Sequence, residues 1–467
     1  MLIQDIAQYV VDERTRPLPA EVLHHAKRVV VDWFAATAPG GLAMPAVGLK
    51  KVYGEQLGHG DARLFPTGER AALRAAAVIN AAASHTAELD DIFRDALYHP
   101  GVTTIPAALA VAETEDASGE QLLRAIVSGY EVATRIARVM GRAHYRYWHN
   151  TATNGSFASA VAAASLLALD RVQIANAIGL AGTMAAGLQQ SFRADSHGKP
   201  MHAAHAVDSG LLCALSAAQG VTGALDILEG EAGYGAAMSE DCDWQLATAG
   251  LGNDYNITRV TNKRHACCGH AFAAIDAALV LRSQHDLRAE NVEAIRVGGY
   301  SATLDVCGKN RHATPFEGKF SVPYLVATAL THGEVGLNAF TEERLHHPDT
   351  ATLAKSTELY LDASIDAEFP ARRAARVQIE TSDGALLERY QPTRRGDPDA
   401  PLDDAELGSK FMSTVTPACG EALAAALLDA CWQLDRLDSV RELPMGDLGP
   451  SDNRAPLTPL SSEKVQG

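Results

Sequence analysis

Apolar residues recur at helical spacing through the first 260 residues of the chain. The clearest runs predict helices over residues 71–83, 103–113, 121–139, 156–169 and 203–218. Alanine occupies many of the apolar positions, which indicates helices that pack closely together. Gly and Pro separate these runs into ordinary globular lengths, and strand signals are nearly absent from this part of the chain.

The pattern changes between residues 264 and 400. Alternation over 292–299 predicts a strand, and 375–390 predicts a hairpin around Ser382-Asp383-Gly384, with a helix over 321–330 between them. After Pro401-Leu402 the helical pattern returns. We therefore predict a mostly α chain, in which a large all-helical domain (1–263 and 401–443) is interrupted by a smaller α/β domain (264–400) and followed by a mobile tail (444–467).

Composition excludes several classes of partner. The 467 residues carry 40 Lys plus Arg against 57 Asp plus Glu, a formal charge of -17, which disfavours nucleic acid and anionic membranes as partners. Seven cysteines form no Cys-x-x-Cys pair, so reduced thiols and a cytoplasmic protein are expected. We expect no export signal and no membrane span.

The segment Ser196-His197-Gly198-Lys199-Pro200 is the most informative motif. Pro200 is expected to hold Lys199 outside the α region and to begin a helix of small residues. The helix start then offers backbone N–H groups and a positive dipole end beside an ammonium, which suits a carboxylate substrate. A plain surface turn is the alternative.

A second cluster, residues 85–101, contains several acids and two histidines between apolar helices. Carboxylates near a histidine can raise its pKa and orient its ring, and His99 is the better acid/base candidate. In the alternative, Asp90 and Asp91 end a helix and His99 closes a turn. No His-x-Glu-x-x-His spacing supports a metal site.

A third cluster, residues 144–156, gathers aromatic and basic side chains before a helix expected to start near Ser156. Trp148 and His149 would suit a cleft, and the alternative is a surface loop with Trp148 packed on the helices. His202 and His205 share one helix face and could hold a metal, but alanines on both sides favour packing.

Taken in order, these motifs and two later ones resemble the MmgE/PrpD family. They are His85 to Pro100, Trp148 to Thr153, Gly198 to Ala203, Lys263 to Cys268, and Lys319 to Tyr324. The resemblance implies a homodimeric enzyme with a large helical domain and an α/β lid, without metal or organic cofactor. Its members include dehydratases, decarboxylases and epimerases that act on small polycarboxylates.

The resemblance also implies residue roles, with the site between the two domains. Catalysis would fall to His99, His149, Lys199 and Tyr324, and substrate binding to Glu88, Asp91, Lys263, Cys268 and His270. The chain departs from the family pattern at Glu88, at Ile92 and around His270. We therefore expect a lyase (dehydratase or decarboxylase) for a di- or tricarboxylate, with an epimerase of an aminated dicarboxylate and a non-catalytic carboxylate binder as alternatives.

Overall fold

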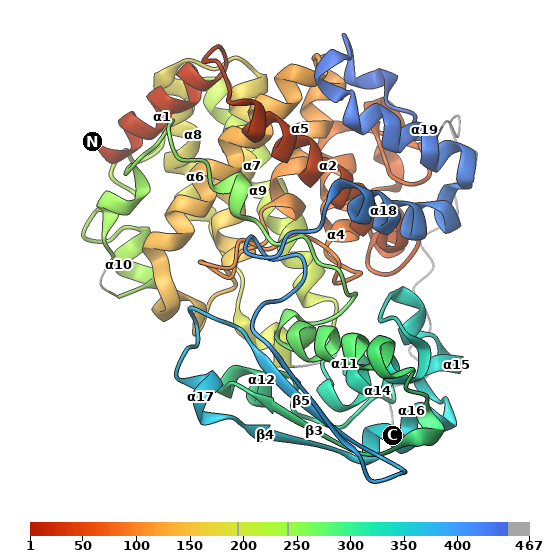
Figure 1. The fold of residues 1–467 in the computed structure, drawn as a ribbon. Helices are drawn as coiled ribbons and strands as arrows, with labels where there is room; N and C mark the ends of the chain where they lie inside the picture. Colours follow the sequence, from red (N-terminus) through yellow and green to blue (C-terminus); the bar gives the residue numbers. More distant parts are fainter. Residues whose placement is uncertain (194–195, 241, 447–467) are drawn as a thin grey trace, which may run out of the picture. The chain divides into compact units, whose positions relative to one another are not determined.

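A computed structural model describes residues 1–193, 196–240 and 242–446, and these form two compact units (Figure 1). The helical unit comprises Met1–Thr86, Phe93–Ile257 and the chain from Phe411 on. The α/β unit comprises Ala87–Ile92 and Thr258–Lys410. The expected mobile tail lies, from residue 447, outside the described residues. The prediction of a mostly α chain with a small sheet region is confirmed.

The helical unit is built from a long series of helices, several of them rich in alanine. In chain order these are α1 (Leu2–Glu13), α2 (Ala20–Gly41), α3 (Ala46–Val52), α4 (Leu73–Ser84), α5 (Gly101–Thr114), α6 (Gly119–Tyr145), α7 (Asn150–Leu166), α8 (Arg171–Met184), α9 (Gly198–Ala218), α10 (Tyr234–Met238) and α19 (Glu421–Trp432). Helix α18 (Asp404–Cys419) contains the boundary between the units.

Helix α7 is the centre of the helical unit. Every residue from Asn150 to Ser165 is buried, and α5, α6, α8 and α9 pack around it. A helix that is buried all round packs against neighbours on every side. Its many Ala, Ser, Thr and Gly residues are small, so those neighbours can approach closely. The closest approach is to α9, where a Cβ on Gly210 would lie 2.5 Å from the Ser159 Cβ and 2.6 Å from the Ser156 carbonyl oxygen.

One expectation for this region is wrong. Two strands, β1 (Leu57–Arg63) and β2 (Arg70–Ala71), form an antiparallel pair in a part of the chain that shows almost no strand signal. The sequence Leu57-Gly-His-Gly-Asp lacks apolar alternation, so no periodicity reveals the pair. Gly60 allows it, since its φ is +87° and a Cβ there would lie 2.8 Å from the Ala71 carbonyl oxygen.

The α/β unit contains a four-stranded sheet in the order β4-β3-β5-β6. Its strands are β3 (Val292–Gly299), β4 (Thr357–Leu361), β5 (Ala375–Thr381) and β6 (Leu386–Gln391). Strand β3 pairs parallel with β4 and antiparallel with β5, and the predicted hairpin joins β5 to β6. The parallel strand β4 was not predicted.

Several helices belong to this unit, and some of them pack against its sheet. They are α11 (Phe272–His285), α12 (Ser301–Cys307), α13 (Pro315–Lys319), α14 (Val322–His332), α15 (Glu342–Leu345), α16 (Pro348–Lys355) and α17 (Ala363–Asp366). Helices α11 and α14 contact each other and pack against strands of the sheet (Figure 1). Alternate residues of β5 are buried beneath them, as expected for a strand with one covered face.

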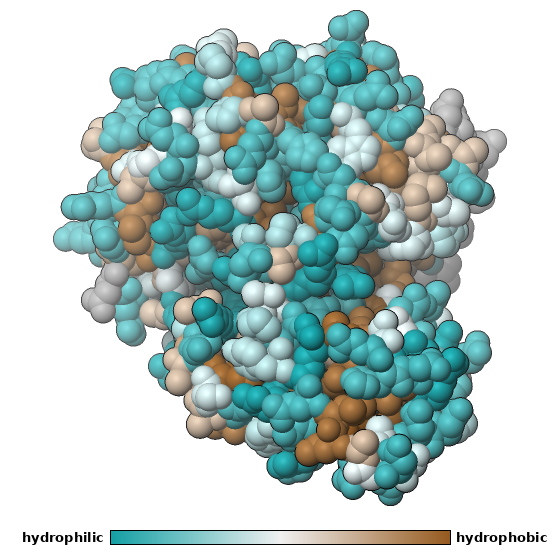
Figure 2. Space-filling view, viewed as in Figure 1, coloured by the Kyte–Doolittle hydropathy of each residue, from teal (hydrophilic) through white to brown (hydrophobic). Residues whose placement is uncertain are grey.

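The visible surface is mostly hydrophilic, in keeping with the charged composition (Figure 2). Figure 2 also shows an apolar area on the viewed face of the α/β unit. Among the described helices, none combines the length and the apolar character that a bilayer crossing requires.

The contact between α7 and α9 gives a direct stability test. Gly→Ala inside a helix ordinarily stabilises it by about 1 kcal/mol, but Gly210→Ala must push the two backbones apart. We expect a net loss of roughly 1–3 kcal/mol in the free energy of unfolding, measured by urea titration. The control is Gly48→Ala in α3, where the new Cβ meets only the end of the Met44 side chain. Equal effects of both changes would contradict this packing argument.

Candidate functional site

His99 follows a short turn that the helical unit holds firmly. Phe93 and Tyr98 pair across the turn, with the Phe93 N–H donating to the Tyr98 carbonyl at 2.7 Å. The Asn150 side chain donates to the Ala96 carbonyl. The His99 N–H itself donates to the Thr151 hydroxyl at 3.3 Å. His99 therefore lies two residues before α5, attached to the first turn of α7.

His149 lies at the N-terminus of α7. The helix begins at Asn150, six residues before the expected start at Ser156, because tertiary packing overrides the low helix propensity of Thr, Asn and Gly. His149 is 1% exposed, and its N–H donates to the Gly187 carbonyl at 2.9 Å. The side chain thus starts from a fixed backbone position.

Lys199 lies in the first turn of α9, which begins at Gly198. The prediction that Pro200 holds Lys199 outside the helix is wrong. The missing N–H of a proline costs nothing in the first turn, where backbone donors have no intrahelical acceptor, so the helix starts before Pro200. Three residues on, His202 lies on the same side of the helix as Lys199.

Four imidazoles from these segments form what we call the histidine cluster: His85, His99, His149 and His202. Ring centroids lie 4.8 Å apart for His85 and His99, 5.7 Å for His85 and His149, and 5.2 Å for His149 and His202. The N-termini of α5, α7 and α9 carry three of these rings, so three positive helix ends meet at the cluster. This arrangement favours an anion.

Burial keeps much of this cluster neutral. It is the main reason that the pKa of His149 lies well below its usual range, and the nearby His85, His202, Lys199 and His99 lower it further. Burial, with His85 and His205 nearby, lowers the pKa of His202 to about 4. Neutral imidazoles can accept a proton at pH 7, and a bound carboxylate would raise their pKa toward the neutral range.

His144 holds the loop that leads to His149. Its ring contacts the Met238 carbonyl at 3.0 Å and the Thr153 hydroxyl at 2.8 Å, and its own carbonyl accepts from the Trp148 N–H at 3.0 Å. Burial lowers its pKa to about 4, so the ring is neutral at pH 7. With Nδ1 donating to the carbonyl, Nε2 must accept from Thr153.

In the α/β unit, the Lys263 ammonium lies among carboxylates. It is 3.1 Å from a Glu88 carboxylate oxygen and 3.9 Å from one of Asp90, and it donates to the Glu88 carbonyl at 3.2 Å. Burial alone would lower the pKa of Lys263, but Glu88 and Asp90 outweigh burial and raise it. Lys263 is 1% exposed, so its charge primarily balances these two acids.

Two further lysines bind the same short segment, Ala87–Ile92. Lys319 donates to the Ala87 carbonyl at 3.3 Å, and Lys410 donates to the Leu89 carbonyl at 2.7 Å. Glu88 has a φ of +60°, which is costly for a residue with a side chain and persists only where its surroundings hold it. The predicted domain boundary at residue 263 places this acidic segment in the helical domain, whereas the segment groups with the α/β unit.

The remaining predicted residues are also in the α/β unit. Asp91 is buried, and the Tyr324 hydroxyl at the start of α14 donates to the Ala339 carbonyl. His270 Nδ1 lies 2.8 Å from the Tyr300 hydroxyl, and burial with Arg373 and Arg394 nearby lowers its pKa to about 3. A hydrogen bond with Cys307 lowers the pKa of the Cys268 thiol. Their roles in substrate binding and catalysis stay predictions.

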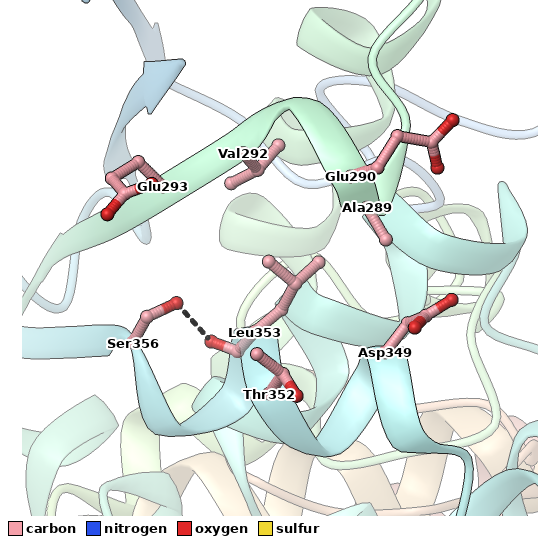
Figure 3. Close-up of a pocket in the computed structure, with 8 residues that line it drawn as sticks. All are labelled: Ala289, Glu290, Val292, Glu293, Asp349, Thr352, Leu353 and Ser356. Carbon is pink, nitrogen blue, oxygen red and sulfur yellow. Dashed lines mark hydrogen bonds between the residues drawn. The ribbon is translucent and has the colours of Figure 1, made fainter. Parts of the chain in front are cut away.

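A pocket of about 380 Å³ in the α/β unit contains none of these residues. Figure 3 shows Val292, Ala289 and Leu353 around its apolar part, with carboxylates at its edges. Its lining is Ala289, Glu290, Val292, Glu293, Asp349, Thr352, Leu353 and Ser356. Acidic side chains of this kind would repel a polycarboxylate, so we do not assign the substrate to this pocket.

Sequence reasoning missed the roles of His85 and His202 in the cluster. The sequence favours His99 over His85 as the acid or base, and it indicates packing or, with His205, a metal pair for His202. His202 instead contacts His149, while His205 faces the Met184 carbonyl at 3.3 Å. The available signal was the position of His202 one turn after Lys199, which puts both on one helix face.

Known proteins resemble the chain over nearly its whole length. Residues 4–247 match the MmgE/PrpD N-terminal domain, and residues 265–434 match the MmgE/PrpD C-terminal domain. The cis-aconitate decarboxylase-like protein oryM of Aspergillus oryzae is 25% identical over 464 residues, which cover 94% of this chain and 95% of that protein. The cis-aconitate decarboxylase of Aspergillus terreus is 24% identical over 471 residues, 94% of each chain. The human cis-aconitate decarboxylase is 25% identical over 463 residues, 93% of this chain and 92% of the relative.

The ion pair of Lys263 predicts a large stability effect. Lys263→Met removes the cation and leaves two buried carboxylates without it, so the free energy of unfolding should fall by about 3–5 kcal/mol. Adding Glu88→Gln should recover part of this loss. The control, Lys309→Met, replaces an exposed lysine of the same unit. Urea unfolding followed by circular dichroism measures all three, and a stable Lys263→Met protein would contradict the assignment.

The neutral His144 predicts destabilisation by acid. Its pKa is about 4 when folded and about 6.5 when unfolded, so the unfolded chain binds more protons between these values. Stability should be complete above pH 6.5 and fall by about 3 kcal/mol toward pH 4 from this group alone. His144→Gln should flatten the dependence of unfolding free energy on pH in this window. The control is His59→Gln, at an exposed position of β1, and identical slopes in both variants would refute the assignment.

Proposed function

Since the chain belongs to the MmgE/PrpD family, we propose that it is a lyase that acts on a small di- or tricarboxylate by proton transfer at a carbon next to a carboxylate. The histidine cluster with Lys199 is the observation that carries the proposal. Relatives named as cis-aconitate decarboxylases, which align over more than nine-tenths of the chain, favour decarboxylation of a cis-aconitate-like substrate.

Binding of the substrate follows from charge. The formal charge of -17 repels polyanions in general, so a polycarboxylate needs a local positive region. The N-termini of α5, α7 and α9 supply it, together with the Lys199 ammonium. A carboxylate bound there would be held by backbone N–H groups and by a cation, which also stabilise charge that develops at an adjoining carbon.

The histidines would move the proton. In decarboxylation, the C–CO₂⁻ bond breaks, carbon dioxide leaves, and the electron pair stays on a carbon conjugated with a second carboxylate. An imidazolium then delivers a proton to that carbon. His149 and His99 are assigned this exchange. The pKa of His149 lies well below its usual range in the free protein, and the negative charge of a bound polyanion would raise it. In dehydration the same groups would remove a carbon-bound proton and protonate the leaving hydroxide.

Proton NMR in deuterated buffer tests this function. The purified chain is given cis-aconitate, citrate, 2-methylcitrate and iminodisuccinate. We expect loss of a carboxyl group from cis-aconitate with deuterium at the new C–H bond. A new olefinic signal from citrate or 2-methylcitrate would instead identify a dehydratase, and deuterium exchange without a new skeleton would identify an epimerase.

Variants assign the roles in the same assay. His149→Asn and His99→Asn should lower kcat about 10²- to 10⁴-fold, and Lys199→Ala should raise KM as well, because it removes a carboxylate contact. Lys309→Ala, at an exposed position in the α/β unit, is the control. If no substrate changes with the folded wild-type chain, or if Lys199→Ala loses activity only in proportion to folded protein, the proposal fails.

A further inference from the structure

The rings of His149 and His202 contact each other through the same nitrogen, Nδ1, of each ring. Their Nδ1 atoms lie 3.1 Å apart, a hydrogen-bond distance, with ring centroids 5.2 Å apart and planes inclined by 43°. His149 precedes α7, and His202 lies in the second turn of α9. The contact therefore joins the two helices that pack most closely in the helical unit.

Only one proton can lie between these two nitrogens. Both rings are neutral at pH 7, because burial and the positive neighbours oppose protonation. A neutral imidazole carries one N–H and one acceptor nitrogen, so one ring donates from Nδ1 and the other accepts. If His149 donates, its Nε2 holds a lone pair and is a base. If His149 accepts, its Nε2 carries the hydrogen, so it can donate a hydrogen bond but cannot accept a proton.

The backbone around the pair leaves the rings little freedom. The Gly187 carbonyl accepts from the His149 N–H, and a Cβ on Gly187 would lie 2.2 Å from the Ala152 Cβ and 3.4 Å from a ring carbon of His202. With φ at +139°, Gly187 adopts a backbone conformation that other residues rarely take. Gly187 thus packs against the His202 ring and also binds the backbone of His149, which keeps the two Nδ1 atoms opposite each other.

We propose that His202 is a positioning residue that sets which nitrogen of His149 carries the proton. The charged and titratable groups that face the pair are His85 after α4, His99 before α5, and Lys199 and His205 on α9. These groups influence the charge of the pair through space, whereas His202 contacts the Nδ1 atom of His149 directly, at 3.1 Å. The proposal rests on the proposed function only for its consequence in turnover.

The first test does not depend on activity. Long-range proton–nitrogen NMR of protein labelled with ¹⁵N-histidine reports which ring nitrogen of His149 is protonated, and His149→Asn assigns its signals. We expect one tautomer of His149 to dominate in the wild type at pH 7.5 and the ratio to change in His202→Leu. His205→Leu, one turn along the same helix, should leave the ratio unchanged. An unchanged ratio in a folded His202→Leu protein would overturn the proposal.

The second test uses turnover. Asn places a donor and an acceptor near the position of an imidazole Nδ1, so His202→Asn should retain most activity, whereas His202→Leu should lower kcat about 100-fold with little change in KM. The pH profile of kcat should shift in the Leu variant and not in His59→Leu, at an exposed position of β1 in the same unit. Equal losses in Asn and Leu would indicate packing only and overturn the proposal. If the wild type turns over none of the carboxylates but the tautomer responds, the proposed function fails and the coupling of the two histidines stands.

Discussion

The close approach of α7 and α9 is the constraint on which the helical unit depends. Gly210 lies against the backbone of α7 near Ser156 and Ser159, where no side chain would fit. Because the two helices touch along small residues, their N-termini also come together, and His149 reaches His202 across the gap. The same packing that stabilises the unit therefore brings basic and polarisable groups to one place, where the positive ends of three helices point.

Burial determines what those groups can do. His144, His149 and His202 are all held neutral at pH 7, chiefly because burial disfavours the charged form. His144 has a structural part, since one ring nitrogen binds the Met238 carbonyl of α10 and the other binds the Thr153 hydroxyl of α7. His149 and His202 instead share a proton between like nitrogens. A bound anion would change the balance of charge at that pair and so couple substrate binding to protonation.

Four lysines near the predicted site residues divide into two kinds. Lys263, Lys319 and Lys410 bind the acidic segment Ala87–Ile92 through carbonyl or carboxylate oxygens within the α/β unit. Their charge and hydrogen bonds allow Glu88 to keep a left-handed backbone conformation and allow its neighbouring acids to be buried. Lys199 differs from them, since it lies in the first turn of a helix in the other unit, beside the histidine cluster. Three of these four lysines thus have a structural part, and only Lys199 is left for the proposed carboxylate contact.

The sequence by itself determined the mostly α composition, the β5–β6 hairpin and the family, because helical periodicity, turn residues and ordered motifs are local properties of the chain. Its ordered motifs also proposed His99, His149, Lys199 and Tyr324 as one catalytic group, which stays a prediction. Only the tertiary structure decided that α7 starts at Asn150, that β1 pairs with β2, and that Lys263 is enclosed by Glu88 and Asp90. These features depend on burial and on the close approach of backbone segments at Gly60 or Gly210. Such contacts join residues that are far apart in the chain, so no hydrophobic periodicity in the sequence reveals them. The contact of His149 with His202 belongs to this second group, because 53 residues separate the two rings in the sequence and helix packing alone brings them within hydrogen-bond distance.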